Sequence, residues 1–209
     1  MDKLLYKFFS LLIFLLSTST ALAGTMQVSI SGISSDAQLY LDFIDGGQPS
    51  NSLKVSSFTS DGSLTLKELT GSATTTAGGY AINDNSFLNG VALSLENVTS
   101  LKFLISFTNN APSVDSFLDS IGLYLYGDDY FNPLVPTDDP LGANALFSWF
   151  ATGVGNGELQ TFASLAASSL TWDVQFVDPQ VPVSEPGTLL LMLLAIASLH
   201  LLRMKNQEV

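Results

Sequence analysis

Cysteine is absent from this chain of 209 residues. Its absence excludes disulfides, thiol nucleophiles, zinc–thiolate sites and iron–sulfur clusters. Histidine is nearly absent as well, because His200 is the only one and lies in an apolar stretch near the C-terminus. A Ser-His-Asp triad therefore lacks its base. We expect no enzymatic activity, and stability must come from burial of a core.

Basic residues are also scarce. Between Gly24 and Val183 there are only three lysines against 16 acidic residues, which leaves a net charge of −13. Binding to nucleic acid or to anionic lipid needs clustered Lys and Arg, so neither is an expected partner of this segment.

The N-terminus has the pattern of a secretory signal peptide. Lys3 and Lys7 precede an apolar run from Phe8 to Leu16, and Ala21 and Ala23 form a small-x-small cleavage site. We expect residues 1–23 to be removed, so that the mature chain begins at Gly24.

The C-terminus combines three features within residues 181–209. An acidic-proline motif comes first, followed by an apolar run from 188 to 202 and a tail, 203–209, with Arg203 and Lys205. The run predicts a transmembrane helix of about 22 Å, shorter than a hydrocarbon core of about 30 Å, and the two cations can snorkel to the interface. Their position predicts that residue 209 faces the cytoplasm and the domain lies outside. The motif residues are Val183, Ser184, Glu185 and Pro186.

This arrangement resembles the PEP-CTERM sorting signal of bacterial exported proteins. The usual motif of that family reads Val-Pro-Glu-Pro, and here Ser184 replaces the first proline. The resemblance implies that the partners are the export machinery and an exosortase, a membrane protease-transferase that removes the tail. It also implies a final location at the cell surface or in the extracellular matrix.

Apolar and polar residues alternate along many short segments between these ends. Strict alternation is typical of half-buried antiparallel strands, and Gly, Asn, Asp, Ser and Pro separate the segments. We predict one all-β domain over residues 24–180, an antiparallel β-sandwich or jelly roll. The alternating segments are 39–43, 64–66, 91–95, 101–107, 121–126, 146–150 and 170–176.

Two of these segments carry a second resemblance. Leu39-Tyr40-Leu41-Asp42-Phe43 and Ile121-Gly122-Leu123-Tyr124-Leu125-Tyr126, the latter followed by an Asp-rich loop, are similar to a group of uncharacterised PEP-CTERM proteins. That group implies a β-rich domain and no assigned activity.

Two glycine- and alanine-rich pieces invite other interpretations. The best helical candidate is Phe162 to Ser168. Gly153 to Gly157 lacks the strand and helix that flank a phosphate-binding loop, so we interpret it as the turn of a hairpin after a strand from Phe147 to Thr152.

The loop from Gly127 to Pro140 is a candidate calcium site. Calcium takes 6–8 oxygen ligands, and carboxylates on a proline-stiffened loop can supply several. The alternative is a solvated acidic connection in which Asp serves turn geometry. We expect no cofactor other than this structural calcium, whose candidate ligands are Asp128, Asp129, Asp138 and Asp139.

Aromatic rings and paired carboxylates give two further candidates. Rings on one sheet face can stack on sugars, although they can equally pack in the core. Glycoside hydrolysis needs two carboxylates about 5–10 Å apart, and Glu68, Glu96 and Glu158 are the only glutamates of the domain. The candidate rings are Tyr124, Tyr126, Tyr130, Phe147 and Trp149.

Together these patterns predict an exported structural or adhesive protein. A carbohydrate-binding module that acts on extracellular polysaccharide is the alternative. Exposed rings around Tyr124 and Trp149 would favour the module, whereas buried rings would favour the structural role.

Overall fold

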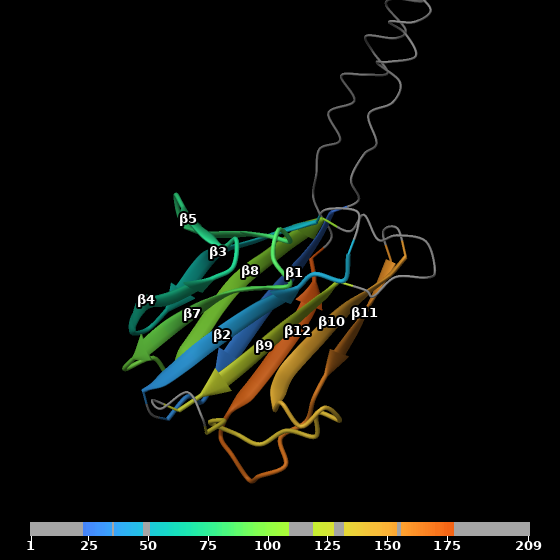
Figure 1. Cartoon of the computed structure of the whole chain (residues 1–209). Helices are drawn as coiled ribbons and strands as arrows, with labels where there is room; N and C mark the ends of the chain where they lie inside the picture. The colour runs from blue at the N-terminus through green and yellow to red at the C-terminus, as the bar shows by residue number, and fades with distance from the viewer. Residues whose placement is uncertain are drawn as a thin grey trace, which may run out of the picture. The chain divides into compact units, whose positions relative to one another are not determined.

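The described part of the chain is an all-β unit. The computed structural model describes residues 23–34, 36–47, 51–108, 119–127, 132–153 and 156–177, and in these ranges it contains strands and no helix (Figure 1). The predicted fold class is confirmed as two antiparallel sheets. The strands are β1 (Ala23–Ser31), β2 (Ala37–Ile44), β3 (Ser52–Ser60), β4 (Ser63–Thr70), β5 (Thr74–Thr76), β6 (Gly79–Asn83), β7 (Leu88–Glu96), β8 (Ser100–Thr108), β9 (Ser120–Tyr126), β10 (Ala145–Gly153), β11 (Asn156–Thr161) and β12 (Thr171–Phe176).

Each sheet has six strands, and every neighbouring pair is antiparallel. The strand order is β12-β1-β8-β3-β6-β5 in the first sheet and β11-β10-β9-β2-β7-β4 in the second. Strands β4 and β5 therefore form one lateral edge of the sandwich, which we call the open edge, and β11 and β12 form the opposite edge.

The core lies between the two sheets. Alternation along β2 sends Leu41 and Phe43 inward from the second sheet, and alternation along β8 sends Phe103 and Ile105 inward from the first. Each of these side chains is at most 1% exposed, and full burial of such a side chain is worth about 1.5–3 kcal/mol. The period-two pattern of the sequence is therefore the pattern of this core.

Strand β3 departs from regular alternation near its end. Its register with β8 shifts between Ser56 and Thr59, and Ser57 has a positive φ of 58°. This β-bulge leaves two residues of β3 without a partner on β8 and turns Phe58 toward the interior, where its ring stacks on Phe103 at 5.4 Å.

The helix expected from Phe162 to Ser168 does not form. The backbone amide of Phe162 donates to Leu146, and the amide of Leu165 donates to Pro136. Ser164 forms an isolated bridge with Thr137. The carbonyl of Ala163, which a helix would pair with the amide of Ala167, instead accepts a hydrogen bond from the amide of Asp138. This piece is therefore an extended connection.

The hairpin expected around Gly153 to Gly157 is confirmed. β10 and β11 pair along their lengths, and the last pair joins Gly153 to Asn156. Strands β1, β3, β5, β6 and β11, by contrast, were not among the predicted alternating segments, although Met26, Val28 and Ile30 of β1 alternate and are buried.

Candidate functional site

The outer face of the second sheet carries an unusual buried carboxylate. One row of paired residues crosses five strands there and runs Thr70, Gly90, Asp42, Gly122 and Ser148. Asp42 stands in the middle of this row, between two glycines, and is only 7% exposed. An outward-pointing acid is normally solvated, so neighbouring side chains must cover it.

Tyrosines provide that cover. A Cβ atom on Gly122 would lie 2.6 Å from the Tyr124 hydroxyl oxygen and 2.5 Å from an Asp42 carboxylate oxygen. A Cβ atom on Gly90 would lie 3.2 Å from the Tyr40 hydroxyl oxygen. The two glycines therefore leave room for the phenols of Tyr40 and Tyr124 to lie close to the sheet on either side of Asp42.

The polar atoms under this cover are hydrogen-bonded. The hydroxyl of Tyr124 and the main-chain amide of Gly122 both donate to the Asp42 carboxylate. On the β7 side of Asp42, the Thr70 hydroxyl is hydrogen-bonded to the phenol of Tyr40. Asp42 thus keeps partners although it has lost most of its contact with water.

Burial changes the proton affinities of this group. Loss of solvent raises the pKa of Asp42 to about 7, although the donors Gly122 and Tyr124 oppose the rise. Burial also raises the pKa of the Tyr124 phenol, and the charge of Asp42 adds to that shift. The site therefore holds a carboxyl group that changes charge near neutral pH.

Three rings surround this carboxyl group. The centroids of Tyr40 and Tyr124 are 6.3 Å apart, and those of Tyr124 and Tyr126 are 6.1 Å apart with an interplanar angle of 15°. All three side chains are half-buried, so part of each ring remains accessible. We call Tyr40, Asp42, Tyr124 and Tyr126 the tyrosine face. It offers apolar ring surface beside phenolic hydroxyls, which are groups that a sugar ring and its hydroxyls contact, and the Asp42 carboxyl group lies beneath the rings.

Two of the five predicted platform rings are in the core instead. Phe147 is fully buried and Trp149 is 3% exposed. The Trp149 ring lies 4.4 Å from the ring of Phe107 in the opposite sheet. The prediction that these rings share a face with Tyr124 is wrong, because Phe147 and Trp149 occupy inward positions of β10 whereas Tyr124 and Tyr126 occupy outward positions of β9. Tyr130 lies outside the described residues.

Sequence reasoning also overlooked Tyr40 and Asp42 as site residues. Both were visible only as polar members of an alternating strand, a position that usually faces solvent. The available signal was a pair of glycines, Gly122 at an outward position of the predicted segment 121–126 and Gly90 just before the predicted segment 91–95. That signal becomes meaningful only when β7 and β9 are known to flank β2.

The candidate calcium loop is described only in part. Asp139 accepts hydrogen bonds from the amides of Leu141 and Ala145, and Asp138 accepts one from Ala163 at 2.6 Å. The bond from Leu141 stabilises a turn, as the alternative to metal binding expects, and the bond from Ala163 joins this loop to the segment after β11. In the ranges that the structure describes, no three His, Asp or Glu side chains gather as a metal would require, and Asp128 and Asp129 lie outside those ranges.

A second polar group lies at one end of the sandwich. Asp119 accepts hydrogen bonds from the amide of Gly46 at 2.8 Å and from the side chain of Asn51 at 2.5 Å. The Asp84 carboxylate accepts a hydrogen bond from the main-chain amide of Asn51. Burial raises the pKa of Asp119. These contacts tie together the segments before β3, before β7 and before β9, so the cluster has a structural role.

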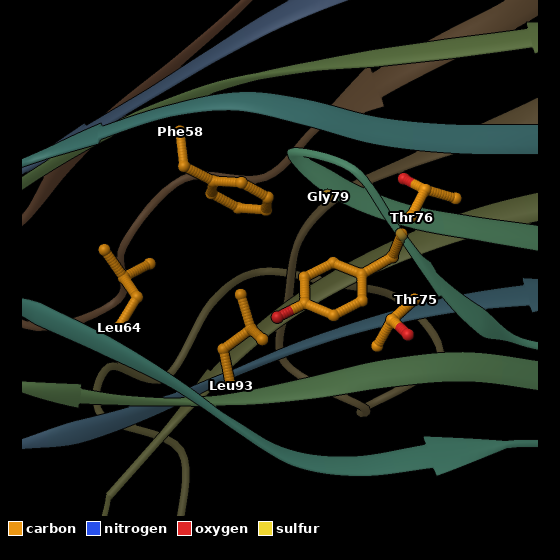
Figure 2. A pocket seen from close by; sticks show the side chains of 7 residues that line it. Phe58, Leu64, Thr75, Thr76, Gly79 and Leu93 are labelled. Atoms are coloured by element: carbon orange, nitrogen blue, oxygen red, sulfur yellow. The ribbon is translucent and has the colours of Figure 1, made fainter.

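A cavity of about 310 Å³ opens between the sheets at the open edge (Figure 2). Phe58 and Leu93 approach it from opposite sheets, and Thr75 and Thr76 of β5 lie at one side. We call this cavity the edge slot. Its lining contains no charged side chain and consists of Phe58, Leu64, Thr75, Thr76, Gly79, Tyr80 and Leu93.

The expected sorting and processing residues fall almost wholly outside the described part of the chain. These are Ala21, the motif Val183 to Pro186, and the cations Arg203 and Lys205. Ala23 is the exception, because it pairs with Thr108 as the first residue of β1. Among the residues that the structure describes, no helix is long and apolar enough to cross a membrane.

Comparison with known proteins does not assign this chain to a family. No family model matches the chain, and no curated protein or solved structure matches it.

Proposed function

We propose that this chain is an exported structural or adhesive protein of the cell surface or extracellular matrix, sorted by an exosortase-type system. The observation that carries the proposal is the coincidence of a secretory signal before residue 24 with an acidic-proline motif, an apolar run and two cations after residue 182. The fold is consistent with this order. Cleavage after Ala23 would leave all but the first residue of β1 in the mature chain.

The sorting part of this proposal is tested by changing the motif. Replacing Glu185 and Pro186 with alanine is expected to leave a chain that still ends at Val209 in the membrane fraction, because the processing enzyme no longer recognises the motif. Intact-mass measurement on protein from the native host would compare it with the unchanged chain, which is expected to begin at Gly24 and to lose its tail. The matched control is alanine at Gln180 and Val181, just before the motif. An unchanged chain that itself keeps Val209 would contradict the proposal.

Carbohydrate binding is the second candidate function, and the tyrosine face favours it. Partly accessible rings with phenolic hydroxyls fit the apolar face and the hydroxyls of a sugar, and the carboxyl group beneath them holds the Tyr124 hydroxyl in place. The ligand would be an extracellular polysaccharide, bound without chemical change. An adhesive protein and a polysaccharide-binding protein are compatible, because attachment to matrix sugar is one way to adhere.

Removal of one ring tests this candidate. Tyr126→Ala is expected to weaken binding to extracellular polysaccharide from the host by on the order of tenfold, or about 1.4 kcal/mol, because a stacking surface is lost. Migration in native gels that contain the polysaccharide measures the change. Phe87→Ala is the control, since Phe87 is 76% exposed and outside the tyrosine face. Equal retardation of both variants and the unchanged chain would exclude this face as the binding surface.

A further inference from the structure

The two lateral edges of the sandwich are closed to different degrees. At the edge formed by β11 and β12, the indole of Trp172 donates to the carbonyl of Leu146 at 2.9 Å and so links the first sheet to the second. At the open edge the edge slot lies between the sheets instead (Figure 2). An apolar cavity beside two edge strands is where an added strand can insert a side chain.

The rim of the slot is apolar as well. Leu66 of β4 pairs with Leu93, which lines the slot, and Leu66 is 42% exposed. Inside, the Phe58 and Tyr80 rings meet nearly edge to face at 6.0 Å. A 150 Å³ apolar cavity is about the size that accepts benzene, so a slot of about 310 Å³ has room for one aromatic side chain.

The opposite edge carries a side chain of the required kind. Phe176, at the end of β12, is 52% exposed, and the adjacent Val177 is 40% exposed. Phe176 pairs with the core residue Met26, so it belongs to the row that faces the interior. Thr75 of β5 also belongs to an inward row, because it pairs with Tyr80, which in turn pairs with the core residue Val55.

Strand direction makes these edges compatible. The first sheet has six strands that are antiparallel throughout, so its edge strands β5 and β12 run in opposite directions. When a second copy is placed beside the first in the same orientation, its β12 therefore meets β5 antiparallel, and the sheet continues with correct polarity. Among the described strands, β5 pairs only with β6 and β12 only with β1, so each has a second edge that faces outward.

Charge disfavours pairing between two β12 edges. The open edge carries Lys67 beside Glu68 on β4, whereas the opposite edge carries Glu158 on β11 and Asp173 on β12. Two copies that met through their β12 edges would bring acidic side chains together, which costs free energy.

From these features we propose that this chain associates head to tail, with β12 of one copy added to β5 of the next and Phe176 inserted in the edge slot. The occupant of the slot is thus a second copy of the same chain. Because the two contacting surfaces differ, the contact leaves one unpaired edge on each copy, and copies that keep the same orientation add to one another in extended chains. The inference stands apart from sorting, since it concerns the sandwich alone.

Cysteine cross-linking tests the contact with little background, because the chain has no cysteine of its own. In the proposed contact Phe176 lies opposite Thr75, so Gln175 lies opposite Thr76, and cysteines at these two positions leave Phe176 in place. Full-length chain with both Thr76→Cys and Gln175→Cys, produced in the native host, is expected to form a ladder of disulfide-linked multimers on non-reducing gels. Opposed residues of antiparallel strands have Cα atoms about 4.5–5.5 Å apart, which suits a disulfide. Thr76→Cys with Leu165→Cys is the matched control, since Leu165 is 67% exposed and on neither edge.

Two outcomes would overturn the proposal. One is a double variant that cross-links no more than the control pair. The other is covalent dimer from Gln175→Cys alone, which would indicate pairing between two β12 edges. A second measurement does not depend on cysteine: Phe176→Asp in the full-length chain is expected to lose the multimers that the unchanged protein forms in detergent, while Leu165→Asp keeps them. Thermal unfolding of both variants would show that each is folded, and multimers that persist in folded Phe176→Asp would contradict the contact.

Discussion

Trp149→Ala is expected to lower the free energy of unfolding by about 3–5 kcal/mol. The indole is 3% exposed and lies 4.4 Å from the Phe107 ring, which comes from the other sheet. It also lies against the main chain of β11, because a Cβ atom on Gly157 would be 2.2 Å from the ring. Removing the indole would leave a cavity between the sheets that strands on both sides cannot collapse to fill. Urea denaturation followed by circular dichroism would measure the loss.

Tyr126→Ala is the natural comparison for this change. Tyr126 is half-buried on the outer face of the same sheet, and its removal opens no cavity between the sheets, so we expect a loss of about 1 kcal/mol or less. If Trp149→Ala cost no more than Tyr126→Ala, Trp149 would be a surface ring. The two variants therefore separate rings that hold the fold from rings that can meet a ligand.

The stability of the protein is expected to fall between pH 4 and pH 8 because of Asp42. Its pKa in the folded state is about 7, against 3.8 for a solvated aspartate. The folded state thus favours the protonated form, so the contribution of Asp42 is complete below pH 4 and is lost as the pH rises through 7. The size of this loss is about 4 kcal/mol, since each unit of pKa corresponds to about 1.4 kcal/mol.

Asp42→Asn isolates this contribution from the rest of an acidic chain. Asparagine has nearly the same shape and no charge, so the difference in unfolding free energy between variant and unchanged protein should rise by about 4 kcal/mol from pH 4 to pH 8. This difference between the two proteins isolates Asp42. Burial also raises the pKa of Asp119, but the titration of Asp119 contributes equally to the unfolding free energy of both proteins. Asp173→Asn removes one exposed charge and serves as the control. A difference that stays flat across this range would mean that water reaches the Asp42 carboxylate in the folded protein.

This titration bears on the tyrosine face as a binding surface. Tyr124 donates its hydroxyl to the Asp42 carboxylate, so the orientation of that ring depends on the charge beneath it. Asp139 also raises the pKa of Tyr124 through its charge, which places the loop before β10 in the electrostatic surroundings of the same ring. Polysaccharide binding should therefore be measured at pH values on both sides of 7.

Particular residues show how far the sequence could predict the site. Alternation in Leu39 to Phe43 correctly placed Leu39, Leu41 and Phe43 in the core. It placed Asp42 on the opposite side, which is also correct, but it could not show that this side is covered. The cover comes from Tyr124, 82 positions later in the sequence, and pairing of β2 with β9 brings the two together.

The ring prediction failed for a related reason. In Leu146 to Phe150 both faces carry large apolar side chains, Leu146 and Phe150 on one and Phe147 and Trp149 on the other, so the segment does not show which face is buried. The register of β10 with β9 shifts between Ala145 and Phe147, and the paired residues that follow place Phe147 and Trp149 inward. A bulge of this kind depends on main-chain pairing between strands and has no reliable mark in a single segment.

The sequence by itself determined the class of the fold, because alternation with a period of two is a local property that only half-buried strands satisfy. It also determined that no cysteine chemistry is possible and that the domain is strongly acidic, and it supports the prediction of export and tail sorting. The tertiary structure alone decided which rings face outward, why Asp42 titrates near neutral pH and where the edge slot lies. These three features depend on which distant strands become neighbours and on the bulges that shift the register between them. Strand pairing and register involve two segments at once, so no single segment of the sequence encodes them.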